Sequence, residues 1–189
     1  MGFEFRRSVL QDVFVITPER FRDDRGYFEE TFKRSVFEEH GIVSTFVQDN
    51  HSTSSAGVVR GLHYQLEPYA QGKLVSVLSG TVWDVAVDLR RSSETFGQHF
   101  GVSLSEERGT MLWIPPGFAH GFVALSETVH LVYKCTAEYA PAHERGIRYN
   151  DPTLEIPWPE RDAEGNPLKY QLSQKDAELP GLHDAEAFA

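Results

Sequence analysis

The sequence predicts a mainly β protein, built as one antiparallel β-sandwich or barrel over residues 1–189. Two observations lead to this fold class. Short runs rich in β-branched and aromatic residues alternate with turn residues at close spacing before Pro141, a pattern typical of sandwiches and barrels. Beyond Pro141 five further prolines interrupt regular structure, so the last third is expected to form loops and short helical turns that cover the sheet.

Each element is expected from local patterns. Ser79 and Gly80 lie between two β-branched runs, and such a two-residue turn predicts the clearest hairpin of the chain. One helix is expected at 33–40, with Val36 and Phe37 facing inward and Gly41 ending it. A polar turn is expected at 52–57. The strands are expected at 13–16, 27–32, 45–50, 58–65, 73–78, 81–87, 96–104, 110–114, 118–125 and 129–136.

The charge balance is acidic, because 18 Lys and Arg against 28 Asp and Glu give a formal net charge of −10. A general nucleic-acid binder needs a basic surface, so this class is excluded. No uninterrupted apolar run approaches the roughly 20 residues of a membrane helix, and the first residues lack the apolar core of a secretion signal. The single cysteine, Cys135, cannot form an internal disulfide. These features predict a cytoplasmic protein without a membrane partner.

Three side chains with acid–base chemistry are expected to point into the barrel. Strand alternation gives His63, Lys73 and Tyr133 the inward faces that they share with Val and Leu residues. A base, a cation and a phenol in an apolar lumen suit proton removal next to a carbonyl, because the cation stabilises the enolate oxygen and the phenol returns a proton. The alternative is structural: a core histidine, a solvated lysine at a strand start, and a tyrosine anchored to backbone.

A metal site is the second interpretation. Pro115, Gly117 and His120 resemble the second half of the signature of cupins, which are barrels that bind a metal through several histidines and a glutamate. The first half needs two histidines separated by one residue, and here Gln65 follows His63 where the second would stand. A neutral amide is a poor ligand for zinc, iron or manganese, so no metal ligands are assigned.

Cations that could bind a phosphate group are few and far apart in the sequence. The candidates are Arg25, Arg60, Arg145 and Lys175. Guanidinium groups are suited to a bidentate grip on phosphate, whereas ion pairing with the abundant surface acids is the alternative for each. Strict alternation places Arg60 on the face opposite His63. The two could serve one site only with a β-bulge near Gly61 or at the rim of the barrel.

The motifs taken together resemble those of one known family. In chain order they are RGYFEE from Arg25, FVQDNHS from Phe46, RGLHYQ from Arg60, QGKLV from Gln71, DVAVDLR from Asp84, WIPPGFAHGF from Trp113, YKC from Tyr133 and LSQKD from Leu172. The combination resembles the dTDP-4-dehydrorhamnose 3,5-epimerase family, and the resemblance runs from about Val13 to Pro180.

The resemblance implies a metal-free, cofactor-independent jelly roll of the cupin type, a homodimer, and dTDP-4-keto-6-deoxyglucose as substrate. The implied reaction is epimerisation at C3 and C5 to dTDP-4-dehydro-L-rhamnose, in dTDP-L-rhamnose biosynthesis. The family's base falls on His63, with Asp176 as its partner. Its enolate-stabilising lysine falls on Lys73, and its acid falls on Tyr133. Substrate-binding roles fall on Arg25, Glu30, Gln48, Asp49, Asn50, Arg60, His120, Glu144, Lys175 and Tyr139, the last as the aromatic residue that packs on the ligand.

Three alternatives stay open on the sequence. A mono-epimerase of the same family, acting at C3 or C5 only, could keep the same site residues. A non-enzymatic sugar-binding jelly roll is disfavoured by the co-occurrence of all four catalytic candidates. A metal-dependent cupin enzyme is disfavoured by Gln65.

The two ends of the chain carry expectations of their own. The N-terminal segment is expected to cross to a partner subunit, since strand exchange commonly covers the edges of barrels. The tail after Pro180 is less defined by the family motifs and is expected to be partly mobile.

Overall fold

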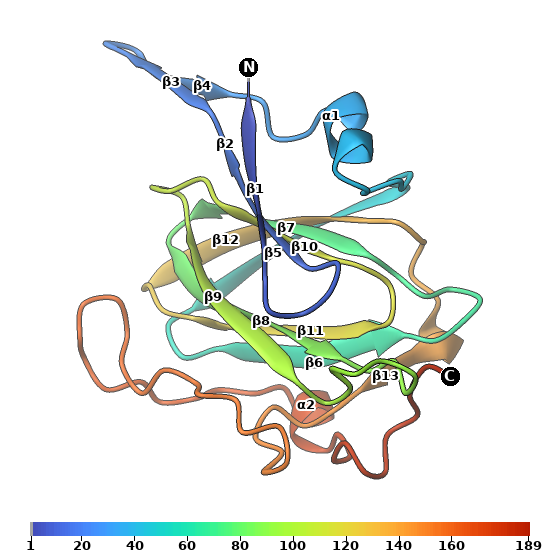
Figure 1. Ribbon diagram of the computed structural model, residues 1–189. Helices are drawn as coiled ribbons and strands as arrows, with labels where there is room; N and C mark the ends of the chain where they lie inside the picture. The colour runs from blue at the N-terminus through green and yellow to red at the C-terminus, as the bar shows by residue number, and fades with distance from the viewer. Residues whose placement is uncertain (1) are drawn as a thin grey trace.

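The computed structural model describes residues 2–189 and shows two antiparallel sheets packed face to face (Figure 1). The first sheet contains, in spatial order, β1 (Phe3–Arg7), β2 (Phe14–Pro18), β10 (Met111–Ile114), β7 (Lys73–Ser79), β12 (Thr128–Cys135) and β5 (Gln48–Ser55). The second contains β13 (Glu144–Gly146), β6 (Val59–Gln65), β11 (Phe118–Ala124), β8 (Thr81–Asp88) and β9 (His99–Ser105). The predicted mainly β, jelly-roll class is therefore confirmed.

The main core lies between the two sheets. Val75 and Leu131 of the six-stranded sheet pack there with Val82 and Ala86 of the five-stranded sheet, and all four are buried. These residues alternate with outward-facing neighbours, as expected for strands with one buried face. The same inward alternation carries Lys73 and Tyr133 toward the lumen, so the polar site is an extension of the apolar core.

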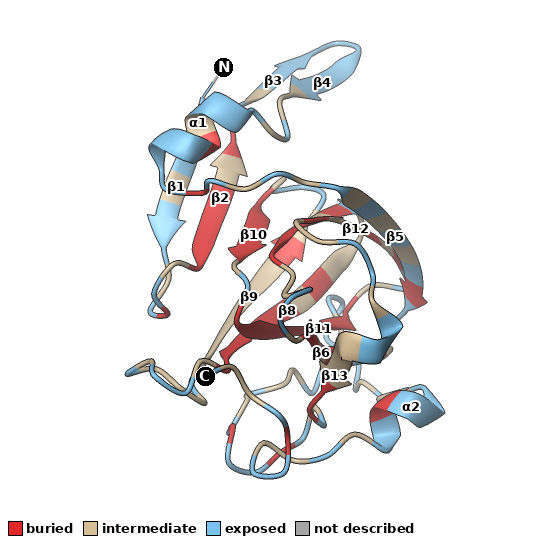
Figure 2. Cartoon of the chain, turned by 90° about the vertical axis from the view of Figure 1, so that its right-hand side faces the viewer, coloured by how far each residue is buried: buried red, intermediate tan, exposed pale blue. Residues whose placement is uncertain are grey.

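A short hairpin and a helix lie outside the barrel. The hairpin, β3 (Arg20–Asp23) paired with β4 (Gly26–Glu29), projects away from the sheets and is largely exposed (Figures 1 and 2). The helix, α1 (Arg34–Glu39), confirms the expected position at 33–40: Phe37 is fully buried against the six-stranded sheet, and Gly41 has a positive φ just after the last turn. Val36, also expected to face inward, is only partly buried. Among residues 2–189, no helix combines the length and apolarity needed to cross a membrane.

The C-terminal third covers the outer face of the five-stranded sheet, as predicted. Beyond a single 3-10 turn (Pro141–His143) and α2 (Gln174–Ala177), it runs mostly as irregular chain below that sheet (Figure 1). Ile147 and Leu154 are buried against Val85 and Val87. The tail is packed and not free, in contrast to the expectation of partial mobility, because Phe188 exchanges backbone hydrogen bonds with the segment that follows β8.

The predicted hairpin at residues 79–80 is wrong. β7 and β8 follow one another through Gly80, whose φ is +81°, but they belong to different sheets and do not pair. The turn carries the chain from one sheet to the other, so Val77 and Val82 meet across the core. A turn signal reports a reversal of the chain, and the reversal here joins two layers instead of two neighbouring strands.

Several strand boundaries also differ from the expectation. The polar turn predicted at 52–57 shrinks to residues 56–57, because the Ser- and Thr-rich residues before it continue β5 and pair with β12. Residues 45–47 are not strand, and β9 begins at His99 instead of residue 96. In the edge strand β5, pairing with β12 outweighs the weak β propensity of the serines. The sequence interpretation also missed β1, β3 and β13, which are short and mostly polar.

A β-bulge interrupts β6 at Gly61. His63 pairs with His120 and Arg60 pairs with Phe122, so β6 contains one more residue than β11 over this stretch. Gly61 has a φ of +119°, and a Cβ atom there would lie 2.5 Å from the Cα of Gly121. Only glycine combines this backbone conformation with this close approach.

We expect Gly61→Ala to lower the free energy of unfolding by at least about 2 kcal/mol, because it adds both an unfavourable φ and a collision with backbone. Gly165→Ala is the matched control, since Gly165 also has a positive φ (+89°) but nothing within 4 Å of the added Cβ. Urea unfolding measures both. Equal losses in the two variants would contradict a packing role for Gly61.

Candidate active site

The centre of the site is a histidine–carboxylate pair that joins the barrel to the C-terminal segment. His63 Nε2 lies 2.6 Å from Asp176 Oδ1, and the Asp176 side chain is only 6% exposed. Asp176 is on α2, whose first turn is capped by Ser173: its hydroxyl accepts a hydrogen bond from the Asp176 N–H at 3.0 Å. This cap fixes the helix where its carboxylate meets the imidazole.

The carboxylate of this pair is held in its ionised form. Burial alone would raise the pKa of Asp176, but hydrogen bonds from His63, the Gly61 backbone and Ser173, with the nearby His63 ring, bring that pKa below its ordinary value. An ionised Asp176 orients the imidazole and leaves the other ring nitrogen free for chemistry.

A buried lysine and a tyrosine come from the facing sheet. Lys73 at the start of β7 is almost fully buried, and its Nζ lies 3.5 Å from the His63 carbonyl oxygen and 5.7 Å from the centre of the Tyr133 ring. Burial lowers the pKa of Lys73 and raises the pKa of Tyr133. The phenol therefore stays protonated, whereas burial works against the charged form of the lysine, so its amine has little solvent to bind.

The bulge at Gly61 brings Arg60 to the same cavity as His63, which was one of the two arrangements expected from the sequence. The Arg60 Nε donates to the Ser54 hydroxyl, and its Nη2 donates to the Thr53 carbonyl, each at 3.0 Å. The cavity measures about 490 Å³. Its polar lining consists of Ser52, Arg60, His63, Lys73, His120, Tyr133, Gln171, Ser173, Lys175 and Asp176.

A second cavity of about 210 Å³ also reaches His63, Lys73 and Tyr133. Its further polar lining consists of Gln48, Asn50, Gln65, Gln71, Tyr139 and Glu144, with Tyr64. Glu144 accepts hydrogen bonds from Lys175 Nζ and from the Tyr139 hydroxyl, both at 2.6 Å. Burial opposes ionisation of Glu144, yet these donors lower its pKa. The two cavities thus share the three residues that the sequence placed in the lumen.

A second histidine–carboxylate pair was missed by the sequence interpretation. His120 Nε2 lies 3.0 and 2.9 Å from the two carboxylate oxygens of Asp84, and both side chains are buried. The missed partner, Asp84, left a signal, since an acid in the middle of the apolar strand β8 must find a donor when it is buried. The pair fixes the ring of His120, whose centre is 6.4 Å from that of Tyr133.

Three predicted binding residues lie outside these cavities. Arg25 sits at the tip of the projecting hairpin, 90% exposed and paired with Asp23. Asp49 lies on the outer face of β5, where it pairs with Lys134, because alternation turns only its neighbours inward. Glu30, just after β4, has one buried carboxylate oxygen that finds no hydrogen-bond partner within residues 2–189.

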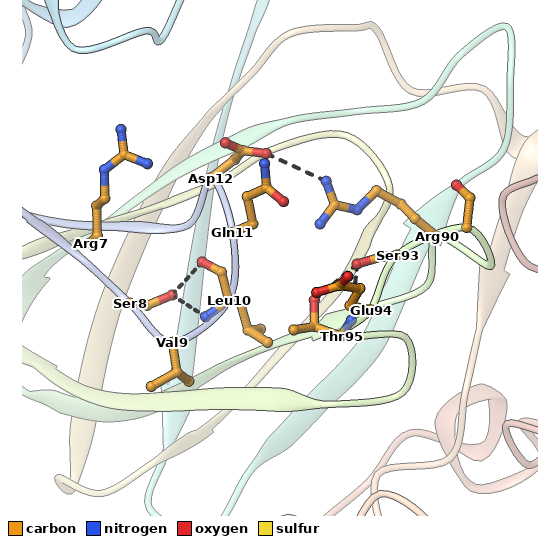
Figure 3. A pocket seen from close by; sticks show the side chains of 11 residues that line it. Arg7, Ser8, Val9, Leu10, Gln11, Asp12, Arg90, Ser93, Glu94 and Thr95 are labelled. Atoms are coloured by element: carbon orange, nitrogen blue, oxygen red, sulfur yellow. Dashed lines mark hydrogen bonds and ion pairs between the residues drawn. The ribbon is translucent and has the colours of Figure 1, made fainter.

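The chemistry, and not the size, singles out the site at His63. A larger cavity of about 620 Å³ lies between the β1–β2 turn and residues 90–95 (Figure 3). There Arg90 donates to Asp88 and lies 3.5 Å from Asp12, so its charge is already paired. Burial opposes ionisation of Asp88, but donors including Arg90 hold its pKa at about 2. These groups satisfy one another and fasten two loops together.

The position of the missing metal ligand is occupied by a fully engaged amide. Gln65 Nε2 donates to the carbonyls of Tyr69 and Glu138, and its Oε1 accepts from the Ala140 N–H. Within residues 2–189, no group of three His, Cys, Asp or Glu side chains is placed to hold a metal ion.

We expect the ionised Asp176 to stabilise the fold. Because its folded pKa lies below the ordinary 3.8, this contribution is complete above pH 3.8 and is lost as the pH falls through the folded pKa. The difference in unfolding free energy between the wild type and Asp176→Asn should therefore be positive at neutral pH and shrink as the pH falls below 3.8. Exposed Asp184→Asn is the control. A difference that grows on acidification would contradict the assignment.

Comparisons with known proteins identify the family. The family model described as dTDP-4-dehydrorhamnose 3,5-epimerase matches residues 7–184. A dTDP-4-dehydrorhamnose 3,5-epimerase of Shigella flexneri is 51% identical over 183 residues, covering 96% of this chain and 97% of that protein.

Two similar solved structures come from enzymes with different activities, a 3,5-epimerase and a 3′-monoepimerase. The epimerase of Legionella pneumophila, in complex with dTDP-4-keto-L-rhamnose, superposes with a TM-score of 0.90 at 47% identity, covering 97% of this chain and 94% of the other. A 3′-monoepimerase of Streptomyces bikiniensis, in complex with dTDP-quinovose, superposes with a TM-score of 0.85 at 31% identity, covering 93% and 86%.

Proposed function

Because the chain belongs to the dTDP-4-dehydrorhamnose 3,5-epimerase family, we propose that it inverts C3 and C5 of dTDP-4-dehydro-6-deoxy-D-glucose to give dTDP-4-dehydro-L-rhamnose. One observation carries the proposal. His63 enters the cavity from the five-stranded sheet, whereas Lys73 and Tyr133 enter from the six-stranded sheet. A sugar held between the sheets is therefore approached by a base on one side and an acid on the other, which is what inversion requires.

The proton transfers follow from this arrangement. The C4 ketone of the substrate acidifies the protons on C3 and C5. Neutral His63, oriented by ionised Asp176, removes a proton from one face of the sugar. Lys73 stabilises the resulting enolate oxygen in a site where little water competes. Tyr133, kept protonated by burial, donates a proton to the opposite face, and the configuration inverts.

The nucleotide is proposed to lie at the mouth of the cavity. Arg60 and Lys175 provide the positive charge for the diphosphate, and Tyr139 offers a ring face to the base. The remaining polar contacts are assigned to Gln48, Asn50, His120 and Glu144.

A homodimer is proposed to complete the site. Arg25 belongs to the motif set, yet on the projecting hairpin it lines neither of the two cavities that contain His63. The hairpin exposes the aromatic rings of Tyr27 and Phe28, and Phe28 is 60% exposed. Neighbouring exposed aromatic side chains are typical of a surface that another protein covers. We propose that the hairpin crosses to a second copy and brings Arg25 and Glu30 to the partner's cavity. A cytoplasmic location is part of the proposal, supported by the single cysteine, Cys135, which is buried and free.

A single epimerisation is the alternative, favoured by the likeness to the 3′-monoepimerase. Incubation with dTDP-4-keto-6-deoxyglucose in deuterium oxide distinguishes the possibilities by NMR of the recovered sugar. We expect deuterium at both C3 and C5, because both protons are acidified by the same ketone. Deuterium at one carbon would identify a mono-epimerase, and at neither a non-enzymatic binding protein.

His63→Asn should lower kcat by about 10³-fold, as expected for loss of a general base. The fold should persist, since His63 is only half-buried. His183→Asn is the matched control, because that histidine is 96% exposed on the tail. Circular dichroism checks the fold and isotope exchange checks the reaction. Near-normal turnover in His63→Asn would refute the proposed base.

Subunit crossing can be tested by complementation. His63→Asn and Arg25→Ala, mixed and allowed to exchange subunits, should form heterodimers with one intact site, which is about a quarter of all sites in an equal mixture. Activity should then rise above the sum of the two separate variants. An unchanged sum, or a mass of one 21.4 kDa chain in sedimentation at micromolar concentration, would refute the crossed dimer.

A further inference from the structure

The segment that carries Tyr139 has no regular secondary structure, yet the barrel holds it by side-chain amides. Residues 137–140 connect β12 to the 3-10 turn. Three glutamines from three other parts of the chain reach their backbone: Gln48 on β5, Gln65 at the end of β6 and Gln71 just before β7. We call these three side chains the glutamine clamp.

The clamp engages each of the four consecutive residues once. Gln71 Nε2 donates to the Ala137 carbonyl at 2.6 Å, and Gln65 Nε2 donates to the Glu138 carbonyl at 3.2 Å. Gln48 Oε1 accepts from the Tyr139 N–H at 2.8 Å. Gln65 Oε1 accepts from the Ala140 N–H at 2.8 Å. Backbone groups that a loop would otherwise leave to water are thus satisfied by the barrel.

The ring of Tyr139 is restrained at its other end as well. Its hydroxyl donates to Glu144 Oε2 at 2.6 Å, and the same oxygen accepts from Lys175. Although both ends are tied, the residue remains 54% exposed beside the cavity that contains His63. A ring that is already ordered and still exposed loses little conformational entropy when a ligand packs on it.

The chemistry of Gln65 explains why an amide stands at the position of the second cupin ligand. The side chain donates twice and accepts once, all to backbone, and it is 4% exposed. A glutamate could not donate, and an imidazole could not form all three bonds with its two nitrogens. This position therefore serves the loop and not a metal.

We propose that Gln65 and Gln71 are positioning residues, which with Gln48 fix residues 137–140 so that Tyr139 is a preformed shelf for the flat base of a nucleoside diphosphate. The inference rests on the proposed function for the identity of the ligand. The clamp acts through Tyr139, so its effect belongs to nucleotide affinity and not to the proton transfers at His63.

The test uses Gln71→Ala and Gln65→Glu in the full chain, with exposed Gln98→Ala as the matched control. Calorimetry measures the Kd for dTDP, and isotope exchange measures kcat and KM. Loss of the clamp bonds should weaken dTDP binding about fivefold and raise KM equally, with kcat unchanged. The control should change none of these values. Unchanged dTDP affinity in both clamp variants, or a loss confined to kcat, would overturn the inference.

A double-mutant cycle separates positioning from general destabilisation. In a Tyr139→Ala background, Gln71→Ala should change the Kd for dTDP by less than about 1.5-fold, because the shelf it positions is gone. An undiminished fivefold effect would show that the glutamine acts by another route and would overturn the inference. If the wild type binds dTDP with this coupling but exchanges no deuterium, the clamp stands and the proposed reaction fails. If the wild type binds no dTDP, the clamp inference fails.

Discussion

One extra residue in β6 decides which side chains share the cavity. In a regular strand the side chains of Arg60 and His63 would lie on opposite faces of the sheet, because successive residues alternate between the two faces. The bulge at Gly61 brings both side chains to the same cavity, because three residues of β6 (from Arg60 to His63) span the distance of two residues on β11. It fits only because two glycine backbones, Gly61 and Gly121, can approach where a Cβ would collide. Every proposed contact that needs the base and the phosphate-binding cation together depends on this local geometry.

The second constraint is the cost of burying charge between two sheets. Asp176 meets His63, Asp84 meets His120 and Glu144 meets Lys175, so each carboxylate has a donor. Lys73 differs, since its acceptor is a backbone carbonyl at 3.5 Å and burial lowers its pKa. A buried amine with so weak an acceptor keeps the capacity to donate to another oxygen, such as one that gains negative charge on a substrate. The overall charge of −10 is no obstacle, because Arg60, Lys73 and Lys175 all line the cavity that contains His63.

Irregular segments supply part of the site, and the barrel holds them by specific bonds. α2 contains four residues, yet the cap by Ser173 and the contact with His63 fix its carboxylate. The glutamine clamp holds residues 137–140 in a comparable way. The tail is tied down further along, where Arg145 pairs with Glu186 and Phe188 packs on Tyr64. Hydrogen bonds to the barrel thus replace local secondary structure in fixing these segments.

The sequence alone determined the β class, most strand positions, the inward faces of His63, Lys73 and Tyr133, and a bulge near Gly61 as one of two ways to bring Arg60 to the site, the other being a site at the barrel rim. These are local properties, set by alternation and turn chemistry. The family resemblance supplied Asp176, which lies 113 residues from its partner and which no spacing rule could pair with it.

Tertiary structure decided the rest. It placed β7 and β8 in different sheets, extended β5 through its serines, paired Asp84 with His120, and turned Asp49 and Arg25 away from the cavity. It also gave three scattered glutamines a common task at Tyr139. These outcomes depend on contacts between residues distant in the chain, where the gain from pairing and from satisfying buried polar groups outweighs local preference. A single sequence records the residue types available for such contacts, but not which of them meet.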